Sequence, residues 1–394
     1  MTNNNQHIPS GYKPSPLGII PEDWEVKRLG EVCTFLDSQR IPIKDADRGK
    51  MQGKYPYYGA SGIIDYVNDY IFDDDLILLG EDGANIISRS TPLAFLVSGK
   101  VWINNHAHVL KTNEGYNRSY ICNYLESLSY DKYNTGTAQP KLNQEVCEHI
   151  PVLIPSEDEQ NKISDLLTLW DTAIAKQTAL IEQLTLRKRG LMQQLLTGKK
   201  RLKGFEGGNF HRLGNYISEC NRKNNGCKRV LSVTNTRGFI LQEEQFDKIV
   251  ASNDTSNYKV VRRGEFAYNP SRVNVGSLAM LNEYDEGILS PMYIVFKANE
   301  NIDKSYLLQC LQSWWFRGHI PAYTQGSVRD SLSFDGLCSM KFYIPTLQEQ
   351  KAISAILEQA DKEIEIQKQK LVAMQEQKKG LMQVLLMGKK RINK

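Results

Sequence analysis

Side chains that could bind nucleic acid gather on glycine-rich loops in two separate parts of this 394-residue chain. Asparagine and glutamine amides read base edges through paired hydrogen bonds, and arginine and lysine contact both bases and phosphates. In the first part, the candidate base-reading residues are Asn104, Asn105, Gln139 and Lys141. In the second part, they are Arg237, Asn269, Arg272, Asn274 and Arg329. Ordinary turns also use asparagine, glycine and serine, so composition alone leaves a structural interpretation open.

The run Asn269-Pro270-Ser271-Arg272 is the nearest approach to a catalytic motif. A DNA methyltransferase carries Asn or Asp, two prolines and an aromatic residue that stacks on the flipped base. This run lacks the second proline and the aromatic residue, so we expect a loop that faces DNA. Gly190 and Gly198 do not have the spacing of a phosphate-binding P-loop either. The chain is therefore expected to have no catalytic residues of its own.

His106 and His108 are spaced to lie on the same side of a strand, as two metal ligands could. No third ligand follows at a suitable spacing. We therefore favour a structural role in the strand and its loop, and we expect no metal site.

The loops belong to two globular regions, residues 18–153 and 206–343, whose pattern predicts mixed β-structure with short helices. Strands are predicted at residues 76–79, 94–97, 101–103, 108–110, 228–233, 259–261, 278–281 and 293–296. One helix is predicted near the end of each region, at residues 118–128 and 304–315. The predicted fold class is α+β.

Each globular region is followed by a segment that occurs twice. Residues 154–201 align without a gap with residues 344–391, at a constant offset of 190, and about 21 of the 48 positions are identical. Chance gives about three identities over this length, so the duplication is secure. The same offset relates Leu142 to Leu332, whereas the earlier parts of the two regions have diverged. The chain therefore contains two copies of one unit. The first part of each copy, its globular front, has diverged, and the second part is nearly constant.

The repeated segments carry the apolar spacing of a coiled coil, in alternating steps of four and three residues. The first seam is Ile163, Leu167, Trp170, Ile174, Gln177, Ile181, Leu184, Lys188, Leu191 and Leu195. The second is Ile353, Leu357, Ala360, Ile364, Gln367, Leu371, Met374, Lys378, Leu381 and Leu385. The polar members Gln177, Lys188, Gln367 and Lys378 are expected to fix the register. A generic buried helix with two tolerated polar residues is the alternative.

Both helices have recognisable ends. Ser156 and Thr346 are candidate N-caps, and Glu159 and Glu349, three residues later, complete a predicted capping box. Gly198 and Gly388 are candidate C-terminal caps, each followed by Lys-Lys-Arg. A helix over about 40 residues is roughly 60 Å long. If the repeats are related by a twofold axis, the two helices pair in antiparallel orientation and hold the two globular regions apart.

Bulk properties fit a cytoplasmic protein. The formal net charge of +4 does not by itself indicate a nucleic-acid partner. The seven cysteines include no Cys-x-x-Cys pair, and we expect them to be reduced. No apolar run approaches the roughly 18 residues of a membrane span. The polar N-terminus lacks the apolar segment of a secretory signal, and residues 1–17 are expected to form a disordered tail.

Several stretches together resemble the specificity subunit of type I restriction–modification enzymes. They include residues 18–30, Leu79-Gly80-Glu81-Asp82-Gly83-Ala84 and Tyr268-Asn269-Pro270-Ser271-Arg272. Both copies of Ile-Pro-x-x-x-Glu-Gln-x-x-Ile and of Gly-Leu-Met-Gln-x-Leu-Leu-x-Gly-Lys complete the resemblance. The match covers nearly the whole chain, in order and with the duplication included.

The resemblance implies two target-recognition domains, at residues 18–153 and 206–343, and two spacer helices, at residues 154–205 and 344–394. Each domain would read one half of a bipartite, asymmetric double-stranded DNA target, while the helices set the gap and dock two modification (methyltransferase) subunits. The assembly would be an adenine-N6 methyltransferase, and added restriction subunits would make it an ATP-dependent endonuclease. S-adenosylmethionine, ATP and Mg²⁺ would then bind to the partners. The alternatives are a stand-alone methyltransferase or nuclease, and a coiled-coil interaction protein without DNA binding.

Overall fold

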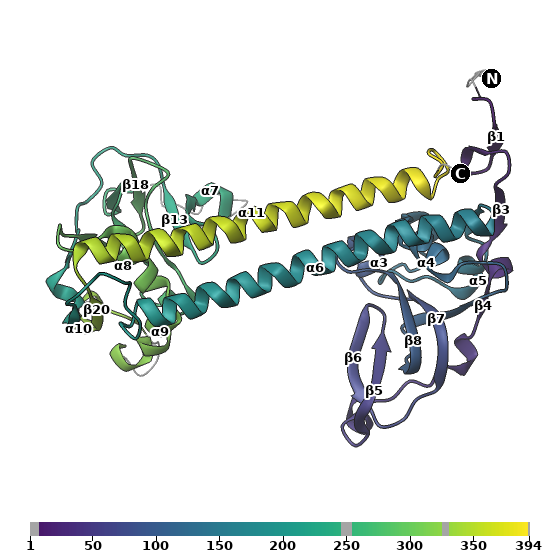
Figure 1. The fold of residues 1–394 in the computed structure, drawn as a ribbon, viewed down its shortest axis with the longest axis horizontal. Coiled ribbons are helices and arrows are strands. Elements are labelled where there is room, and N and C mark those ends of the chain that lie inside the picture. The colour runs from purple at the N-terminus through teal and green to yellow at the C-terminus, as the bar shows by residue number, and fades with distance from the viewer. Residues whose placement is uncertain (1–7, 246–253, 325–330, 393–394) are drawn as a thin grey trace. The chain divides into compact units, whose positions relative to one another are not determined.

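The computed structural model describes residues 8–245, 254–324 and 331–392. The chain forms two compact units (Figure 1). Unit 1 contains residues 1–177 and 370–394, and unit 2 contains residues 178–369. Each unit thus combines one globular front with part of both long helices. The predicted boundaries at residues 153, 205 and 343 stay a prediction, because the compact units divide inside the helices.

Unit 1 is built on a six-stranded sheet of order β4-β9-β7-β8-β5-β6. Its strands are β4 (Cys33–Phe35), β5 (Gln52–Gly59), β6 (Gly62–Val67), β7 (Phe72–Gly80), β8 (Ala94–Ile103) and β9 (Ala107–Thr112). All pairings are antiparallel except β5 with β8. Strand β7 is buried on both faces, since Ile77 and Leu79 pack in one core and Leu76 and Leu78 in another. The two strands predicted at residues 94–97 and 101–103 are one continuous strand, β8.

Short helices cover this sheet or connect its strands. They are α1 (Leu29–Val32), α2 (Asp45–Arg48), α3 (Asn85–Ser88), α4 (Arg118–Ser127) and α5 (Gln144–Glu148). Tyr120, Tyr124 and Leu125 of α4 pack in the core that also holds Ile77. Part of the expected disordered tail is instead a hairpin, because β1 (Tyr12–Ser15) pairs with β2 (Gly18–Pro21). The turn between them needs Gly18, whose φ of +104° is in the glycine region.

Unit 2 contains a smaller, four-stranded sheet of order β12-β19-β16-β17 and two further strand pairs, β13-β14 and β15-β18. Its strands are β12 (Ile217–Glu219), β13 (Leu231–Thr234), β14 (Gly238–Leu241), β15 (Lys259–Arg262), β16 (Phe266–Tyr268), β17 (Leu278–Met280), β18 (Glu286–Leu289) and β19 (Ile294–Ala298). Its short helices are α7 (Gln242–Gln245), α8 (Lys304–Gln312), α9 (Trp314–His319) and α10 (Phe334–Ser339). The single helix predicted at residues 304–315 is wrong, because Ser313 has an extended backbone and caps α9, where its Oγ accepts the Phe316 N–H at 3.1 Å.

The two fronts close in the same way although their sheets differ. In unit 1, β3 (Glu25–Arg28) pairs with β10 (Pro151–Ile154), the last strand before the long helix. In unit 2, β11 (Asn209–Arg212) pairs with β20 (Lys341–Ile344). The leucine after the first strand is fully buried in both cases, and the Leu29 and Leu213 N–H groups donate to Ile150 and Met340 carbonyls.

The long helices are α6 (Glu157–Leu195) and α11 (Leu347–Leu385), each 39 residues and therefore about 58 Å long (Figure 1). Every predicted seam position is buried or half-buried. In unit 1, Lys378 Nζ lies 2.6 Å from Asp171 Oδ1, and in unit 2, Lys188 Nζ lies 2.5 Å from Asp361 Oδ1. These pairs join the late part of one helix to the early part of the other. The predicted antiparallel pairing and the α+β fold class are confirmed.

The helix starts differ from the predicted capping boxes. Ser156 Oγ and Thr346 Oγ1 do accept the N–H groups of Glu159 and Glu349. The two carboxylates do not return to the caps, however. Glu159 accepts from Trp24 Nε1 at 3.0 Å and from Arg391 at 2.7 Å, and Glu349 accepts from Arg201 at 2.5 and 3.0 Å. The Lys-Lys-Arg ends therefore supply arginines that bind the first turn of the other helix.

The next repeated residues attach each front to its helix. The Gln160 side chain accepts the N–H of Asn117, the N-cap of α4, at 2.9 Å. The Gln350 side chain accepts the N–H of Asp303, the N-cap of α8, at 2.7 Å. Ser164 and Ser354 donate to the same two caps. The Glu-Gln-x-x-x-Ser sequence thus makes intramolecular contacts in both copies.

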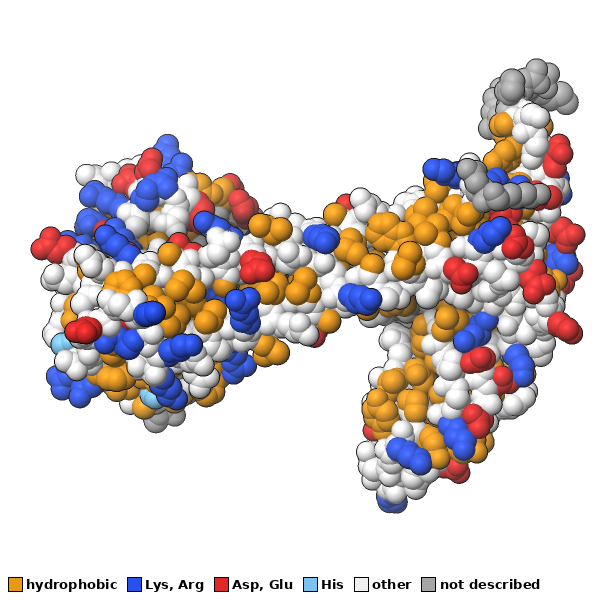
Figure 2. Space-filling model, viewed as in Figure 1, with side chains coloured by type: hydrophobic (Ala, Val, Ile, Leu, Met, Phe, Trp, Pro, Cys, Tyr) orange, Lys and Arg blue, Asp and Glu red, His pale blue; other side chains and the backbone are white. Residues whose placement is uncertain are grey.

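The surface of the long helices is partly apolar (Figure 2). Outward-facing positions with large exposed fractions are Leu169 (65%) and Val372 (54%) in unit 1, and Leu186 (65%) and Ile366 (60%) in unit 2. None of the helices in the described residues is long and apolar enough to cross a membrane.

The seam ion pairs lead to a first prediction. Lys188→Glu should lower the free energy of unfolding of unit 2 by about 1 kcal/mol, because it places a second negative charge beside Asp361. Solvent partly screens this repulsion, since Asp361 is partly exposed. The double variant with Asp361→Lys should recover most of the loss in a denaturant titration. Arg187→Glu is the matched control, since Arg187 is exposed beside the seam. Equal losses in all three variants would exclude a specific pair.

Candidate nucleic-acid interface

Three loops of unit 1 are joined by backbone hydrogen bonds. Residues 81–84 connect β7 to α3, residues 104–106 connect β8 to β9, and residues 134–142 lead to α5. The Glu81 N–H donates to the His106 carbonyl and the Leu142 N–H donates to the Glu81 carbonyl, both at 2.8 Å. The structure therefore brings together the four predicted residues of the first region. Asn105, Gln139 and Lys141 are exposed, whereas Asn104 is buried.

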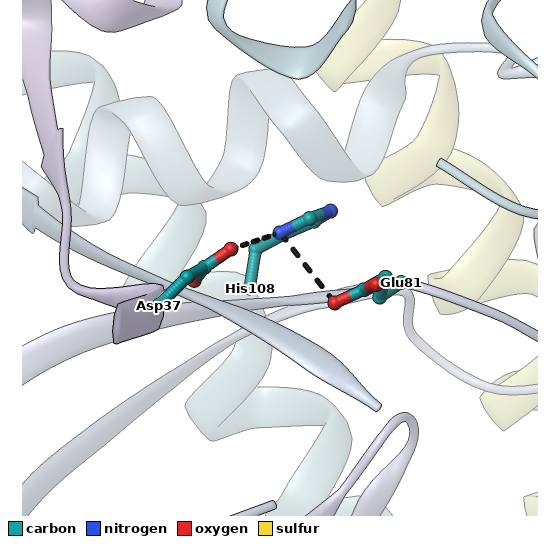
Figure 3. Close-up of side chains that lie close together, drawn as sticks. All are labelled: Asp37, Glu81 and His108. Carbon is teal, nitrogen blue, oxygen red and sulfur yellow. Dashed lines mark hydrogen bonds and ion pairs between the residues drawn. The ribbon is translucent and has the colours of Figure 1, made fainter. Parts of the chain in front are cut away.

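A buried ion network holds these loops (Figure 3). His108 Nδ1 lies 2.5 Å from Asp37 Oδ2, and its Nε2 lies 2.9 Å from the Leu142 carbonyl. Both acceptors are oxygens, so both ring nitrogens carry protons. Burial alone lowers the pKa of His108, but the hydrogen bond to Asp37, with further contributions from Cys147, raises it to about 10. His108 is therefore an imidazolium cation.

The network continues to the surface through Glu81. Arg40 donates to Glu81 Oε2 and to the Ala107 carbonyl, both at 2.7 Å. Lys141 Nζ lies 3.3 Å from Glu81 Oε1. The exposed side chain of Lys141, a predicted base-reading residue, is therefore paired with a carboxylate that the network orients.

Asp37, Glu81 and His108 lie close enough together to be considered as metal ligands. The imidazole has no free lone pair, because it donates to Asp37 and to the Leu142 carbonyl. Arg40 also lies 3.3 Å from Asp37 and 2.7 Å from Glu81, and its positive charge opposes a cation at this place. His106 bonds to a different carboxylate, Asp82, at 2.8 Å. These groups form a structural ion network rather than a metal centre.

Unit 2 places its candidate residues on two neighbouring connections. Residues 235–237 form the turn between β13 and β14, and residues 269–277 connect β16 to β17. Ser277 Oγ donates to the Val233 carbonyl at 2.8 Å, which ties the two together. Arg237, Asn269, Arg272 and Asn274 lie on these connections, and Arg329 lies outside the described residues.

The candidates of unit 2 differ in how free their side chains are. The Oδ1 atoms of Asn269 and Asn274 accept nearby backbone N–H groups, which is ordinary turn chemistry. Arg237 lies 3.9 Å from Glu244. Arg272 is exposed and makes no ion pair within the part of the chain that the structure describes. Arg272 is therefore the candidate arginine of unit 2 that the described part of the chain leaves exposed without an ion pair.

The two units anchor their last loop in the same way. In unit 2, Tyr268 Oη donates to the Leu332 carbonyl, and the Leu332 N–H donates to the Pro270 carbonyl. In unit 1, His108 and the Glu81 carbonyl make the corresponding bonds to Leu142. The offset that relates Leu142 to Leu332 therefore marks a shared anchor beneath two unrelated sets of loops.

Sequence reasoning missed Arg317 as a candidate. Arg317 on α9 lines a cavity of about 300 Å³ together with Asn235, Thr236 and Gly276. The helix predicted to end at residue 315 gave no reason to place Arg317 beside the β13–β14 turn. Of the neighbouring aromatic residues, Phe316 is buried, while Trp314 is 67% exposed with Arg189 over its ring.

The chain thus carries two fronts with different polar loops, each on the same kind of anchor and followed by the same kind of helix. The family model described as "Type I restriction modification DNA specificity domain" matches residues 21–186 and again residues 214–376. The chain belongs to this family: it is a type I restriction–modification specificity subunit, which is the non-catalytic subunit of such systems.

Relatives support the full-length match. The MjaVIII specificity subunit of Methanocaldococcus jannaschii is 25% identical over 95% of this chain and 94% of its own length. A putative specificity subunit of Haemophilus influenzae, S.HindORF215P, is 34% identical, but over only 36% of each chain. The crystal structure of a type I restriction–modification S subunit from M. genitalium has a TM-score of 0.57 at 12% identity, covering 92% of this chain and 96% of that one. At this identity, the likeness shows the fold.

The His108 cation leads to a second prediction. Its pKa is about 10 in the folded protein and near 6.5 when unfolded, so its contribution to stability is complete below pH 6.5 and is lost as the pH rises toward 10. His108→Gln should therefore remove part of the fall in melting temperature between pH 6.5 and 10. His211→Gln, on β11 of unit 2, is the control. Identical pH profiles for the His108 variant and the parent protein would contradict the assignment.

Proposed function

We propose that this subunit reads a bipartite, asymmetric double-stranded DNA target, with one half read by the loops of each unit. One observation carries this proposal: two unlike sets of polar loops rest on the same anchor, at Leu142 and Leu332. Loops that read the same bases would be expected to stay alike. Base contacts specify sequence, whereas the common helices carry no base-reading loops.

The long helices are proposed to set the gap between the halves and to dock two modification subunits. α6 is unbroken over 39 residues, and each unit contains a part of it. Its exposed Leu169 and Leu186, with Val372 and Ile366 of α11, give each unit two large apolar side chains directed outward. Where such side chains form a contiguous apolar patch, the patch marks a protein interface. S-adenosylmethionine, ATP and Mg²⁺ would bind to the modification and restriction subunits, and the complex would act in the cytoplasm.

The half-sites provide a third prediction. Arg272→Ala should weaken discrimination at one half of the target by about 10-fold and leave the other half unchanged, because Arg272 is exposed without an ion partner among the described residues. Lys141→Ala should do the converse. The target would be mapped by sequencing methylated adenines, and binding measured with the assembled methyltransferase on DNA altered in one half at a time. Equal loss at both halves, or no loss, would show that the residues are wrongly assigned.

The alternative of a stand-alone methyltransferase or nuclease predicts turnover by the purified chain. We expect none with DNA, S-adenosylmethionine, Mg²⁺ and ATP, because the loop at residues 269–272 has its amide oxygen committed to a turn and lacks an aromatic stacking residue. Adding the modification subunits should restore methylation. Turnover by the chain alone, abolished by Asn269→Ala, would contradict the proposal.

A further inference from the structure

Unit 1 contains a shallow pocket beside the recognition loops. Its volume is about 240 Å³, and it is lined by residues 59–64 of the β5–β6 hairpin and by Asn104 and His106. This lining combines polar side chains with two isoleucines. The pocket is large enough to admit the edge of a base but not a second protein element.

Asn104 forms the buried polar wall of this pocket. The residue is only 4% exposed, and its Oδ1 accepts the His106 N–H at 2.8 Å. That bond fixes which end of the amide is oxygen, because a backbone N–H needs an acceptor. The Nδ2 group makes no hydrogen bond to any described residue. A Cβ on Gly59, which also lines the pocket, would lie 3.6 Å from this nitrogen. Asn104 therefore presents an unpartnered donor to the pocket.

The opposite wall is apolar and exposed. Ile63 and Ile64 of β6 are 47% and 55% exposed. Gly59 keeps the space open, since a Cβ there would lie 2.9 Å from Ile64 Cδ1. One hydrogen-bond donor thus faces the same small space as a methyl-rich surface.

In the major groove, a donor beside an apolar surface matches one base better than the others. Thymine presents the O4 acceptor and the C5 methyl group side by side. Cytosine presents an amino donor, which would oppose the Asn104 Nδ2 group. Guanine and adenine offer acceptors but no methyl group for Ile63 and Ile64.

We propose that this pocket reads a thymine of the half-target recognised by unit 1, with Asn104 Nδ2 donating to O4 and Ile63 and Ile64 contacting the methyl group. The inference rests on the proposed function, because it assumes that unit 1 faces the major groove. The inference names the base and the two contacts made to it, which cannot be deduced from the types of residue in the loops.

The test uses the assembled methyltransferase and its mapped target. Each thymine of the unit 1 half, identified by its response to Lys141→Ala, is replaced by uracil, which removes only the methyl group. Uracil at one position should weaken binding about fourfold, the effect of one buried methyl group. Ile64→Ala, a surface change, should bind more weakly but lose this sensitivity to uracil. Uracil at thymines of the other half is the matched control, with equal effects expected in both proteins.

The donor is tested separately with Asn104→Asp, which keeps Oδ1 and replaces the donor with an acceptor. This variant should shift preference at the same position from thymine toward 5-methylcytosine by about 10-fold. The melting temperatures of both variants are recorded. If the Asn104 variant does not fold, the uracil experiment with Ile64→Ala decides the assignment of the pocket. A unit 1 half-target without thymine, or uracil tolerated at every thymine, would overturn the pocket assignment. Failure of the proposed function is distinct, because Lys141→Ala would then affect both halves or neither.

Discussion

In each unit, an ion pair joins a glutamate in the first turn of one long helix to an arginine that follows the other long helix. Both units depend on this interaction. Glu159 and Glu349 are almost completely buried, and each is neutralised by an arginine that follows the opposite helix, Arg391 or Arg201. Removing one partner of a buried pair is costly because the remaining charge is left uncompensated. These bonds therefore fix the antiparallel register, and the adjacent Gln160 and Gln350 fix the fronts to that register.

The sequence predicted well those features that depend on the local spacing of residues along the repeats. The heptad seam follows from spacing that a reader can count, and the family was indicated by the resemblance of several sequence stretches. The repeat alone does not show what its identical residues contact. In the structure, Glu159, Gln160 and Ser164 bind other parts of the same chain. Intramolecular docking alone is a sufficient reason for their repetition.

The candidate site was predictable only as a set of residue types. Which loops meet depends on strand pairing between distant segments, and no local pattern shows that Leu142 binds between His108 and Glu81. Likewise, Ser313 reads as a helical residue until its capping bond to Phe316 is seen. The two anchors also differ chemically, since a charged imidazolium in unit 1 replaces a neutral phenol, Tyr268, in unit 2.

The composition of unit 1 has a consequence for how the protein is made. Met382, Leu385 and Leu386 lie in the same core as Ile20 and Trp24, so residues far apart in the sequence complete one unit. A ribosome adds these side chains after all those of unit 2. Unit 2 has its full set of residues once Gln369 is added, whereas unit 1 keeps part of its core uncovered until Leu386 has followed.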